Sequence, residues 1–332
     1  MKISRRLVGL VSALFLILAV GTVALFGRST NEFPAGKPGP EITIVINSGE
    51  YGSSIAAKLE AGGVVKKAST FITAIANDPR GNSIAPGSHL VHTHIPSKQA
   101  LSELLDSKRN RGALILKEGN TYSDVIAALK KANISISGKN PQPVLANNRN
   151  SLEGQLFPAT YSFAPGTNSS QALTAMVEKF HNVSRATGLI GGFEKYSAYE
   201  VLTVASMVQI EGDPTDYSKV ARVIYNRLRI GMPLQLNSTV QYVANLRGKI
   251  ALSRNATKIQ SPYNTYLHTG LTPTPISNPG EAAINASLHP IDGNWLYFIT
   301  VKPHDTRFTN DFATFQEWVA LYNNNLANGA FR

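Results

Sequence analysis

The sequence predicts a mixed α+β protein that one N-terminal transmembrane helix holds at a membrane. The prediction rests on an uncharged apolar run near the N-terminus, two short strand–turn–helix patterns, and an apolar helix that precedes a long polar segment. Hydrophobic residues make up 43% of the 332-residue chain and charged residues 16%, a balance typical of folded domains. This length is enough for more than one domain.

The apolar run Leu7 to Phe26 carries no charge and has the roughly 20 residues with which an α-helix crosses a bilayer. Three basic residues precede it, namely Lys2, Arg5 and Arg6. Positive charge favours the cytoplasmic side, so we expect the rest of the chain to lie outside the plasma membrane. The run is longer than the apolar core of a cleaved signal peptide, about 7–15 residues. We therefore expect residues 1–27 to form a cytoplasmic stub and an uncleaved, single-pass anchor.

Residues 28–40 contain closely spaced proline and glycine, so they are predicted to form a linker. Two segments beyond it repeat each other: "IVINSGEYGSSIAAKLEAGGV" begins at Ile44 and "LILKEGNTYSDVIAALKKANI" at Leu114. Each pattern predicts a short strand, a glycine turn and an amphipathic helix. Ser53 and Ser123 lie where a hydroxyl would cap the helix N-terminus.

These patterns divide the remaining chain into a small module at 41–110, a connecting module at 111–196 and a larger domain at 197–332. Each repeated segment is either a glycan-binding or spacing module, or a packing unit without a ligand. The polar stretch "GKNPQPVLANNRN" separates the second repeat from a segment rich in aromatics and turn formers.

The stretch "VLTVASMVQIEGDP", Val201 to Pro214, predicts an apolar helix that ends in a carboxylate. Its apolar positions and Glu211 follow helical spacing. Gly212 can adopt the left-handed conformation that closes a helix, and Pro214 cannot continue one. Glu211 is therefore predicted to be the last helical residue, or nearly so.

Two effects should raise the pKa of Glu211. Apolar surroundings disfavour a buried charge, and the C-terminal end of a helix disfavours an anion. A glutamate that stays protonated near neutral pH suits general acid catalysis. The alternative interpretation is an ordinary glutamate that faces solvent from a frayed helix end.

The segment from Tyr217 to Gly280 contains eight basic residues and no aspartate or glutamate. Its amides, hydroxyls and aromatic rings suit a carbohydrate, whose hydroxyls need partners and whose ring faces need apolar platforms. The candidate substrate-binding residues are Asn226, Gln235, Asn237, Gln241, Ser261, Tyr263, Asn264 and Tyr266. Each is alternatively a turn or capping residue. The proline-rich segment Gly270 to Gly280 is expected to form a rigid loop at the wall of a cleft.

Several ordered blocks resemble the YceG-like family, the membrane-anchored endolytic murein transglycosylases known as MltG. These blocks are "ASMVQIEGD", "VARVIYNRLRIGMPLQLNSTVQY", "SPYNTYLHTGLTPTPISNPGEAAINASLHP" and "LYFI". "LEGQLFPATYSF" resembles the block ahead of the family's catalytic domain, and the Ile44 segment resembles its LysM-like part. The resemblance implies a LysM-like module at 41–110 and a catalytic transglycosylase domain at 197–332.

Glu211 occupies the position of the family's catalytic glutamate. The chain departs from the family pattern at Gln209 and Asn237, where acidic residues are usual. The resemblance implies non-hydrolytic cleavage of the MurNAc–GlcNAc β-1,4 bond within nascent peptidoglycan, with Glu211 as single acid/base and 1,6-anhydroMurNAc ends. Peptidoglycan strands are then the main partner, and cell-wall synthases or division proteins are partners by family implication.

Three alternatives remain at this point. Asp213 or Asp216 could pair with Glu211 in a two-carboxylate hydrolytic muramidase. The two departures also allow a catalytically silent, peptidoglycan-binding scaffold. The net charge of +11 suits nucleic acid, but we recognise no nucleic-acid-binding motif and predict no such partner. The chain has no cysteine, so thiol catalysis is excluded, and we predict no cofactor and no metal.

Overall fold

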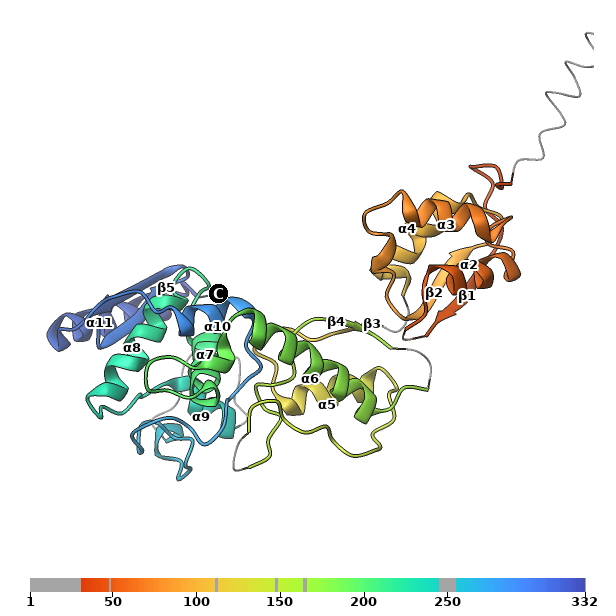
Figure 1. The fold of residues 1–332 in the computed structure, drawn as a ribbon. Helices are drawn as coiled ribbons and strands as arrows, with labels where there is room; N and C mark the ends of the chain where they lie inside the picture. Colours follow the sequence, from red (N-terminus) through yellow and green to blue (C-terminus); the bar gives the residue numbers. More distant parts are fainter. Residues whose placement is uncertain are drawn as a thin grey trace, which may run out of the picture. The chain divides into compact units, whose positions relative to one another are not determined.

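The computed structural model describes residues 31–47, 49–110, 113–146, 149–163, 166–244 and 255–331. They form two compact units (Figure 1). The N-terminal unit reaches Ala113 and includes Ser162–Pro165, and the C-terminal unit comprises Leu114–Tyr161 and Gly166–Arg332. The predicted anchor lies outside the described residues. No helix within them is long and apolar enough to cross a membrane.

The N-terminal unit is a β-α-α-β arrangement with a further helix. Its elements are β1 (Glu41–Ile46), α2 (Gly52–Ala61), α3 (Ala68–Ala76), η1 (Gly81–Ser83), β2 (Gly87–His92), α4 (Ser97–Leu105) and η2 (Ser107–Arg109). β1 and β2 pair antiparallel, with Ile44 opposite His89. Alternate residues of each strand face the helices, and Ile46, Phe71 and Val91 lie in the core between them.

The two repeated segments both fold as predicted, into a strand, a turn and a helix. Gly49 and Gly119 occupy equivalent turn positions, and both have a φ of +80°. This left-handed region is open to glycine but costly for most other residues. The shared glycine is therefore required by the shape of the turn.

The predicted helix caps were wrong. α2 begins after Tyr51 without a side-chain cap. The helix of the second segment, α5 (Tyr122–Lys131), is capped by Thr121, which accepts from the Asp124 N–H in a reciprocal capping box. Ser123 instead lies inside the first turn and shares a hydrogen bond with the Thr121 hydroxyl.

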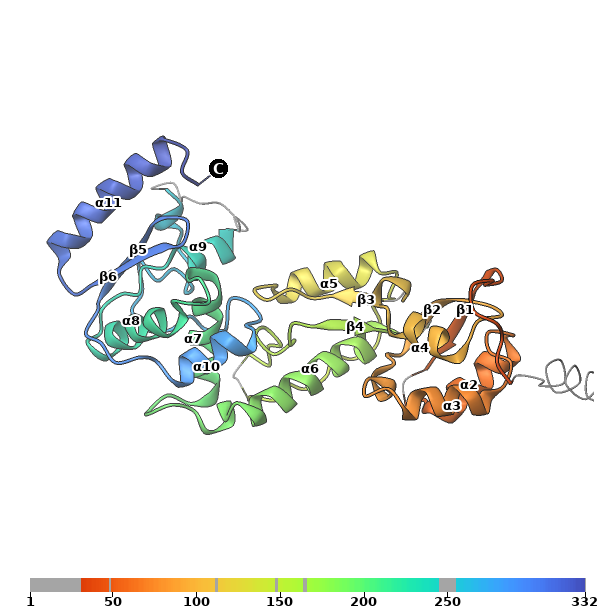
Figure 2. The same cartoon turned by 90° about the horizontal axis from the view of Figure 1, so that it is seen from above.

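The C-terminal unit contains the remaining helices and two short β-ribbons (Figure 2). Its elements after α5 are β4 (Thr160–Ser162), α6 (Ser169–Ala186), η3 (Leu189–Gly191), α7 (Ala198–Glu211), α8 (Tyr217–Arg229), α9 (Asn237–Ala244), η4 (Ala256–Lys258), α10 (Glu281–Leu288), β5 (Tyr297–Lys302), β6 (Asp305–Thr309) and α11 (Phe312–Ala327). β3 (Ala113–Ile115) pairs with β4, and β5 pairs antiparallel with β6. The predicted mixed α+β architecture is confirmed.

α7 is the central helix of this unit and packs against α8 and α10. Its side chains from Val201 to Val208 are buried on every side, as expected for a helix that is apolar around its circumference. The proline-rich loop also packs against it, because the Ser206 hydroxyl accepts from the Ile276 N–H at 3.0 Å. Much of the loop is buried in the core, and its residues Leu271, Thr272 and Pro273 line a cavity of about 670 Å³, in line with the expected role at the wall of a cleft.

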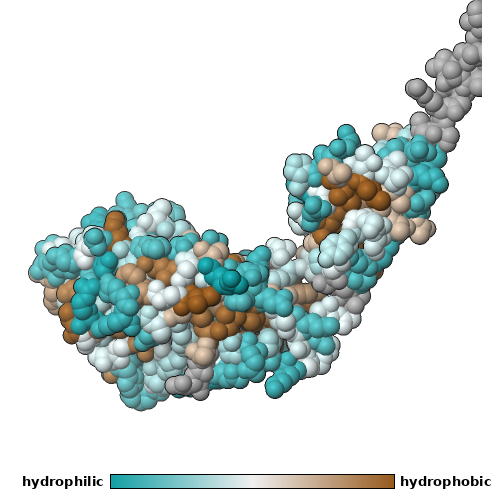
Figure 3. All heavy atoms as spheres, in the orientation of Figure 1, coloured by the Kyte–Doolittle hydropathy of each residue, from teal (hydrophilic) through white to brown (hydrophobic). Residues whose placement is uncertain are grey.

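The predicted boundary at residue 197 lies inside the C-terminal unit, so residues 114–161 belong to the same compact body as the helices beyond 197. Ser197 caps α7 in a capping box with Glu200. The division into connecting and catalytic modules stays a prediction. The surface seen in Figure 3 is largely hydrophilic, with apolar patches on both units.

Candidate active site

Glu211 is the last residue of α7, as the sequence predicted. Gly212 is not left-handed, since its φ of −123° and ψ of 159° are extended. Its small size serves packing instead. A Cβ atom at Gly212 would lie 3.2 Å from a Val220 methyl and 3.3 Å from the Tyr217 ring. Glycine therefore lets the turn run close beneath α8.

A cavity of about 570 Å³ opens at the end of α7. This volume is in the range of ligand-binding pockets, about 300–1,000 Å³. One part of its lining is polar and includes Glu211, Arg227, Gln235, Asn237 and Tyr266. The other part comes from β5, α11 and the C-terminal residues, and is mainly aromatic. Its residues are Tyr297, Phe298, Ile299, Thr300, Phe312, Phe315, Val319, Tyr322, Asn323 and Phe331.

The Glu211 carboxyl receives one backbone hydrogen bond from the described residues. The Ser238 backbone N–H, in the first turn of α9, donates to Oε1 at 3.0 Å. Burial raises the pKa of Glu211, while the contact with Ser238 and the positive charge of Arg227 act weakly in the opposite direction. The group thus resembles a buried acid, because desolvation outweighs the contacts that stabilise its anion.

Arg227 is a buried cation in the cavity lining, with 6% of its surface exposed. Its guanidinium donates to the Leu296 carbonyl at 2.6 Å and to the Leu234 carbonyl. It also lies 5.5 Å from the centroid of the Tyr297 ring, within reach of a cation–π interaction. These contacts hold the positively charged guanidinium in place in the lining that also contains Glu211.

Tyr266 and Asn237 form a hydrogen-bonded pair beside Glu211. The Tyr266 hydroxyl donates to Asn237 Oδ1 at 2.7 Å. Burial, together with the negative charge of Glu211, raises the pKa of Tyr266 to about 12. The phenol therefore stays protonated at neutral pH and can act as a donor. Gln235 lines the same wall with a left-handed φ of +49°, a conformation uncommon for residues other than glycine.

Two of the predicted sugar ligands are structural. Asn226 donates from its amide nitrogen to the Gly293 and Trp295 carbonyls at 3.0 and 2.9 Å. Asn264 is completely buried, with its amide nitrogen bonded to two backbone carbonyls and its oxygen to the Tyr266 N–H. A substrate could not reach Asn264 without unfolding its loop, so the sequence-based assignment of these two residues is not supported.

Gln241, Ser261 and Tyr263 also lie away from the cavity of Glu211. Gln241 is buried on α9, and the Ser261 hydroxyl accepts from the Tyr263 N–H. Tyr263 lines a separate cavity of about 400 Å³ together with Glu153 and Tyr242. Among the predicted binding residues, the structure therefore brings Gln235, Asn237 and Tyr266 to Glu211.

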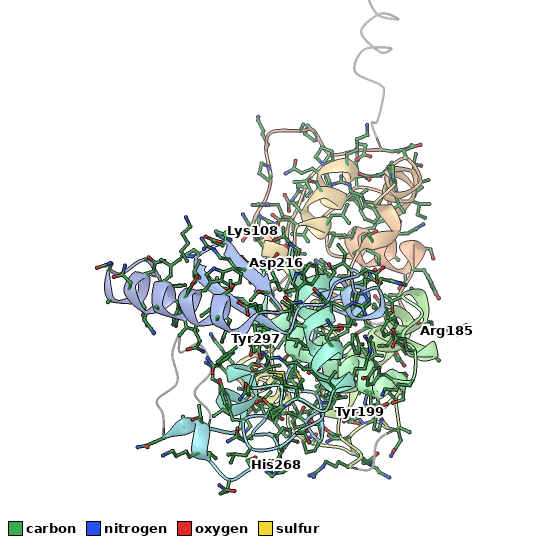
Figure 4. The ribbon with its side chains drawn as sticks, turned by 90° about the vertical axis from the view of Figure 1, so that its left-hand side faces the viewer. Lys108, Arg185, Tyr199, Asp216, His268 and Tyr297 are labelled. Carbon is green, nitrogen blue, oxygen red and sulfur yellow. The ribbon has the colours of Figure 1, made fainter. Side chains whose placement is uncertain are left out.

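No second carboxylate lines the cavity among the described residues. Asp213 Oδ2 lies 3.0 Å from His304 Nδ1 at the surface, and Asp216 lies 3.8 Å from the Lys219 ammonium. Of the residues labelled in Figure 4, Tyr297 lines the cavity and Asp216 does not. Residues 245–254, which lie outside the described part of the chain, contain neither aspartate nor glutamate.

Gln209 has a positioning role that its residue type did not reveal. Its side-chain oxygen accepts from the Gly280 N–H at 2.9 Å, and its nitrogen donates to the Tyr217 hydroxyl at 2.8 Å. The amide thus joins the end of α7 to the start of both α10 and α8. An amide can serve these two partners together because it both donates and accepts.

The aromatic wall was missed by the sequence analysis. Phe312, Phe315, Val319 and Tyr322 follow one another at intervals of three, four and three residues, so they share one face of α11. That spacing was a usable signal. The partner strand β5 and the link to Glu211, about 100 residues earlier, had no local signal.

The comparisons with known proteins agree with this fold. A sequence profile of the YceG-like family matches residues 44–320, and the chain belongs to this family. The chain is 39% identical over 165 residues to the endolytic murein transglycosylase of Bacillus subtilis strain 168, covering 49% of this chain and 46% of that protein. It is 38% identical over 154 residues to the protein of the same name from Streptococcus pneumoniae strain D39, covering 45% and 28% respectively.

These alignments span less than half the length of the curated relatives. A 2.6 Å crystal structure of a YceG-like protein from Listeria monocytogenes covers 83% of this chain and 98% of that one, with 25% identity and a TM-score of 0.53. The likeness therefore extends over most of the fold.

Proposed function

We propose that the protein is an endolytic murein transglycosylase that cleaves the MurNAc–GlcNAc β-1,4 bond in nascent peptidoglycan without water. The observation that carries the proposal is a half-buried glutamate with a raised pKa that lines a substrate-sized cavity. The relatives named for this activity in two bacterial genera point the same way.

In the first step, protonated Glu211 donates its proton to the glycosidic oxygen as the bond to C1 of MurNAc breaks. The Tyr266 hydroxyl and the Gln235 amide lie on the same wall, where they can hydrogen-bond sugar hydroxyls. Burial keeps the proton on Glu211 until the leaving oxygen needs it, which is the condition for a general acid at neutral pH.

In the second step, the Glu211 carboxylate takes the proton of the muramoyl C6 hydroxyl, whose oxygen closes onto C1. The product end is 1,6-anhydroMurNAc, and Glu211 regains its proton. The Ser238 N–H and the fixed charge of Arg227 stabilise the carboxylate between the two steps. Because the nucleophile belongs to the substrate, orientation replaces a second catalytic group.

The absence of another carboxylate from the described lining supports this route over hydrolysis. Retaining and inverting glycosidases place a second carboxylate about 5–5.5 or 6.5–9.5 Å from the acid. Asp213 contacts His304, Asp216 pairs with Lys219, and neither aspartate lines the cavity. The departure at Asn237 also fits a single-carboxylate site, because Asn237 accepts from Tyr266 and cannot act as a base.

We further propose that Leu7–Phe26 anchors the protein in the plasma membrane with the C-terminal domain outside, where peptidoglycan lies. The LysM-like identity of residues 41–110 and contacts with wall synthases or division proteins belong to the same proposal. N-terminal sequencing of protein extracted from membranes should give a start ahead of Leu7. A mature start near residue 30 would exclude the anchor.

The activity is tested by incubating long, purified glycan strands with the full chain and following their length distribution. An endolytic enzyme should shorten the whole distribution early, since it cuts inside strands. If the strands keep their length although the chain is folded and binds them, the protein is a catalytically silent scaffold and not an enzyme.

A further inference from the structure

The aromatic wall lines the same cavity as Glu211, and its rings contact one another. The Tyr297 ring lies beside Arg227 and stacks on Phe315, with centroids 5.1 Å apart and ring planes at 25°. Phe312 contacts both rings, at 5.5 Å from Tyr297 and 6.3 Å from Phe315. We call Tyr297, Phe312 and Phe315 the ring platform.

The platform is poorly covered by protein. α11 has no buried residue, although its mean composition is apolar, and Phe312 is 56% exposed. Aromatic side chains that do not enter a core and instead line a cavity are more typical of a binding surface than of packing.

α11 is nevertheless fixed in place. Asp311 caps its N-terminus by accepting from the Thr314 N–H, and Asn325 near its C-terminus donates to the Val301 carbonyl at 2.8 Å. One turn beyond Phe315, Trp318 lies 5.9 Å from the Arg307 guanidinium. The rings are therefore presented by an anchored helix.

We propose that the ring platform is a glycan subsite, on which the face of a hexosamine ring next to the cleaved bond stacks. The inference rests on the proposed function and extends it by naming the surface that holds the strand in register. Sugar rings present apolar C–H faces and polar edges, and the platform matches both. Its flat rings carry the Tyr297 hydroxyl, and Thr300 and Asn323 lie along the same lining.

This mixed lining favours a sugar over an apolar lipid chain. A lipid tail has no hydrogen-bonding groups, so it would offer no partner to the Tyr297 hydroxyl or the Asn323 amide in a dehydrated site. Continuity with Glu211 in one cavity also favours the strand that is cleaved there.

The test measures binding without turnover, in the full chain carrying Glu211→Gln. The probe is glycan strands stripped of their peptides, titrated calorimetrically. Phe312→Leu and Phe315→Leu keep apolar volume but remove the flat ring. Glu317→Ala, on the opposite and exposed side of α11, is the matched control for damage to the helix.

We expect each leucine variant to weaken strand binding by roughly 3- to 10-fold, as for the loss of an aromatic contact, and Glu317→Ala to leave affinity unchanged. Equal affinity in the leucine variants would overturn the inference, and so would equal losses in Glu317→Ala. Binding of polyprenyl phosphate vesicles that the leucine variants retain, with no binding of strands, would assign the platform to lipid instead.

Turnover by the unmodified chain separates this inference from the proposed function. If the chain cleaves strands but the leucine variants bind them normally, only the subsite is wrong. If the chain neither cleaves nor binds strands, both proposals fail.

Discussion

Two glutamates in the C-terminal unit, Glu153 and the half-buried Glu211, have opposite environments. Glu153 is 4% exposed, and both of its oxygens accept from fixed donors: the Tyr122 N–H at 3.0 Å and the Tyr242 hydroxyl at 3.0 Å. Among the described residues, Glu211 has one such bond, to Oε1, and it lines a larger cavity. A carboxylate held at both oxygens joins elements together, whereas one with an oxygen facing a cavity can exchange a proton with a ligand.

The two glutamates line two different cavities. Tyr242 and Tyr263, whose centroids lie 5.3 Å apart, line the cavity of Glu153. There Glu153 ties the start of α5 to α9. At Glu211 the lining groups instead leave an acidic proton accessible. Burial of a glutamate therefore does not by itself identify a catalytic acid. A carboxyl oxygen that no fixed donor binds does identify one.

The largest effect is expected from Glu211→Gln, which should lower turnover by about 10²–10⁴-fold, the usual contribution of general acid–base catalysis. The amide keeps the shape of the side chain but cannot cycle a proton. Turnover of glycan strands measures the loss. Near-normal turnover in the folded variant would remove Glu211 from the mechanism.

The same variant should be at least as stable as the parent at neutral pH. The folded-state pKa of Glu211 lies above its unfolded value, so ionisation costs stability as pH rises from about 4.3 through the folded pKa. The amide of the variant does not ionise and carries no such cost. Thermal melts should show that the melting temperature of the variant, relative to that of the parent, is higher at pH 8 than at pH 5.

Glu153→Gln should behave in the opposite way. It is expected to destabilise the fold by about 1–3 kcal/mol, because the amide cannot accept at both former oxygen positions and leaves a buried donor unpaired. Turnover per folded molecule should change far less than for Glu211→Gln. A melting curve and an activity assay on the same sample decide this, and unchanged stability with lost turnover would reverse the assignment of roles.

Two asparagines extend the comparison. Asn264→Ala should cost about 1–3 kcal/mol of stability, since it removes the partners of two part-buried carbonyls and one N–H. Asn237→Ala should mainly weaken turnover, because Asn237 lines the cavity and holds Tyr266. If Asn264→Ala melted normally but failed to turn over substrate, the sequence-based assignment of Asn264 as a sugar ligand would regain support.

The smallest expected effect is a shift in pH dependence. Activity should fall as pH rises through the raised pKa of Glu211, because the leaving oxygen then lacks its proton. Ser238→Pro removes the N–H that stabilises the anion, in the first helical turn where proline is tolerated. The alkaline limb of the rate profile should move up by about one pH unit. Ser238→Ala keeps the N–H and should move the limb far less.

The sequence was informative where the signal was local. The apolar run up to Glu211, followed by Gly212 and Pro214, correctly predicted where α7 ends, and the glycine turns of both repeats were also predicted. The sugar-suited amides were less informative. Asn226 and Asn237 have the same side chain, and only the tertiary fold shows that one bonds a loop while the other lines the cavity.

The aromatic wall is the part of the site that the sequence did not predict. Its spacing on α11 could be read from the sequence, but its position beside Glu211 depends on β5 carrying Tyr297 next to Arg227 of α8. Such a contact joins segments about 70 residues apart, and no periodicity encodes it. Long-range packing, rather than residue type, therefore separates the residues found in advance from those that were missed.

The central claim, that Glu211 works without a second carboxylate, is tested most directly by the mass of the product ends. Strands digested by the full chain should end in 1,6-anhydroMurNAc, one water lighter than a hydrolysed end, and Asp213→Asn and Asp216→Asn should leave that product unchanged. Reducing ends that carry the full water, and that disappear in either aspartate variant, would contradict the account and establish a two-carboxylate muramidase.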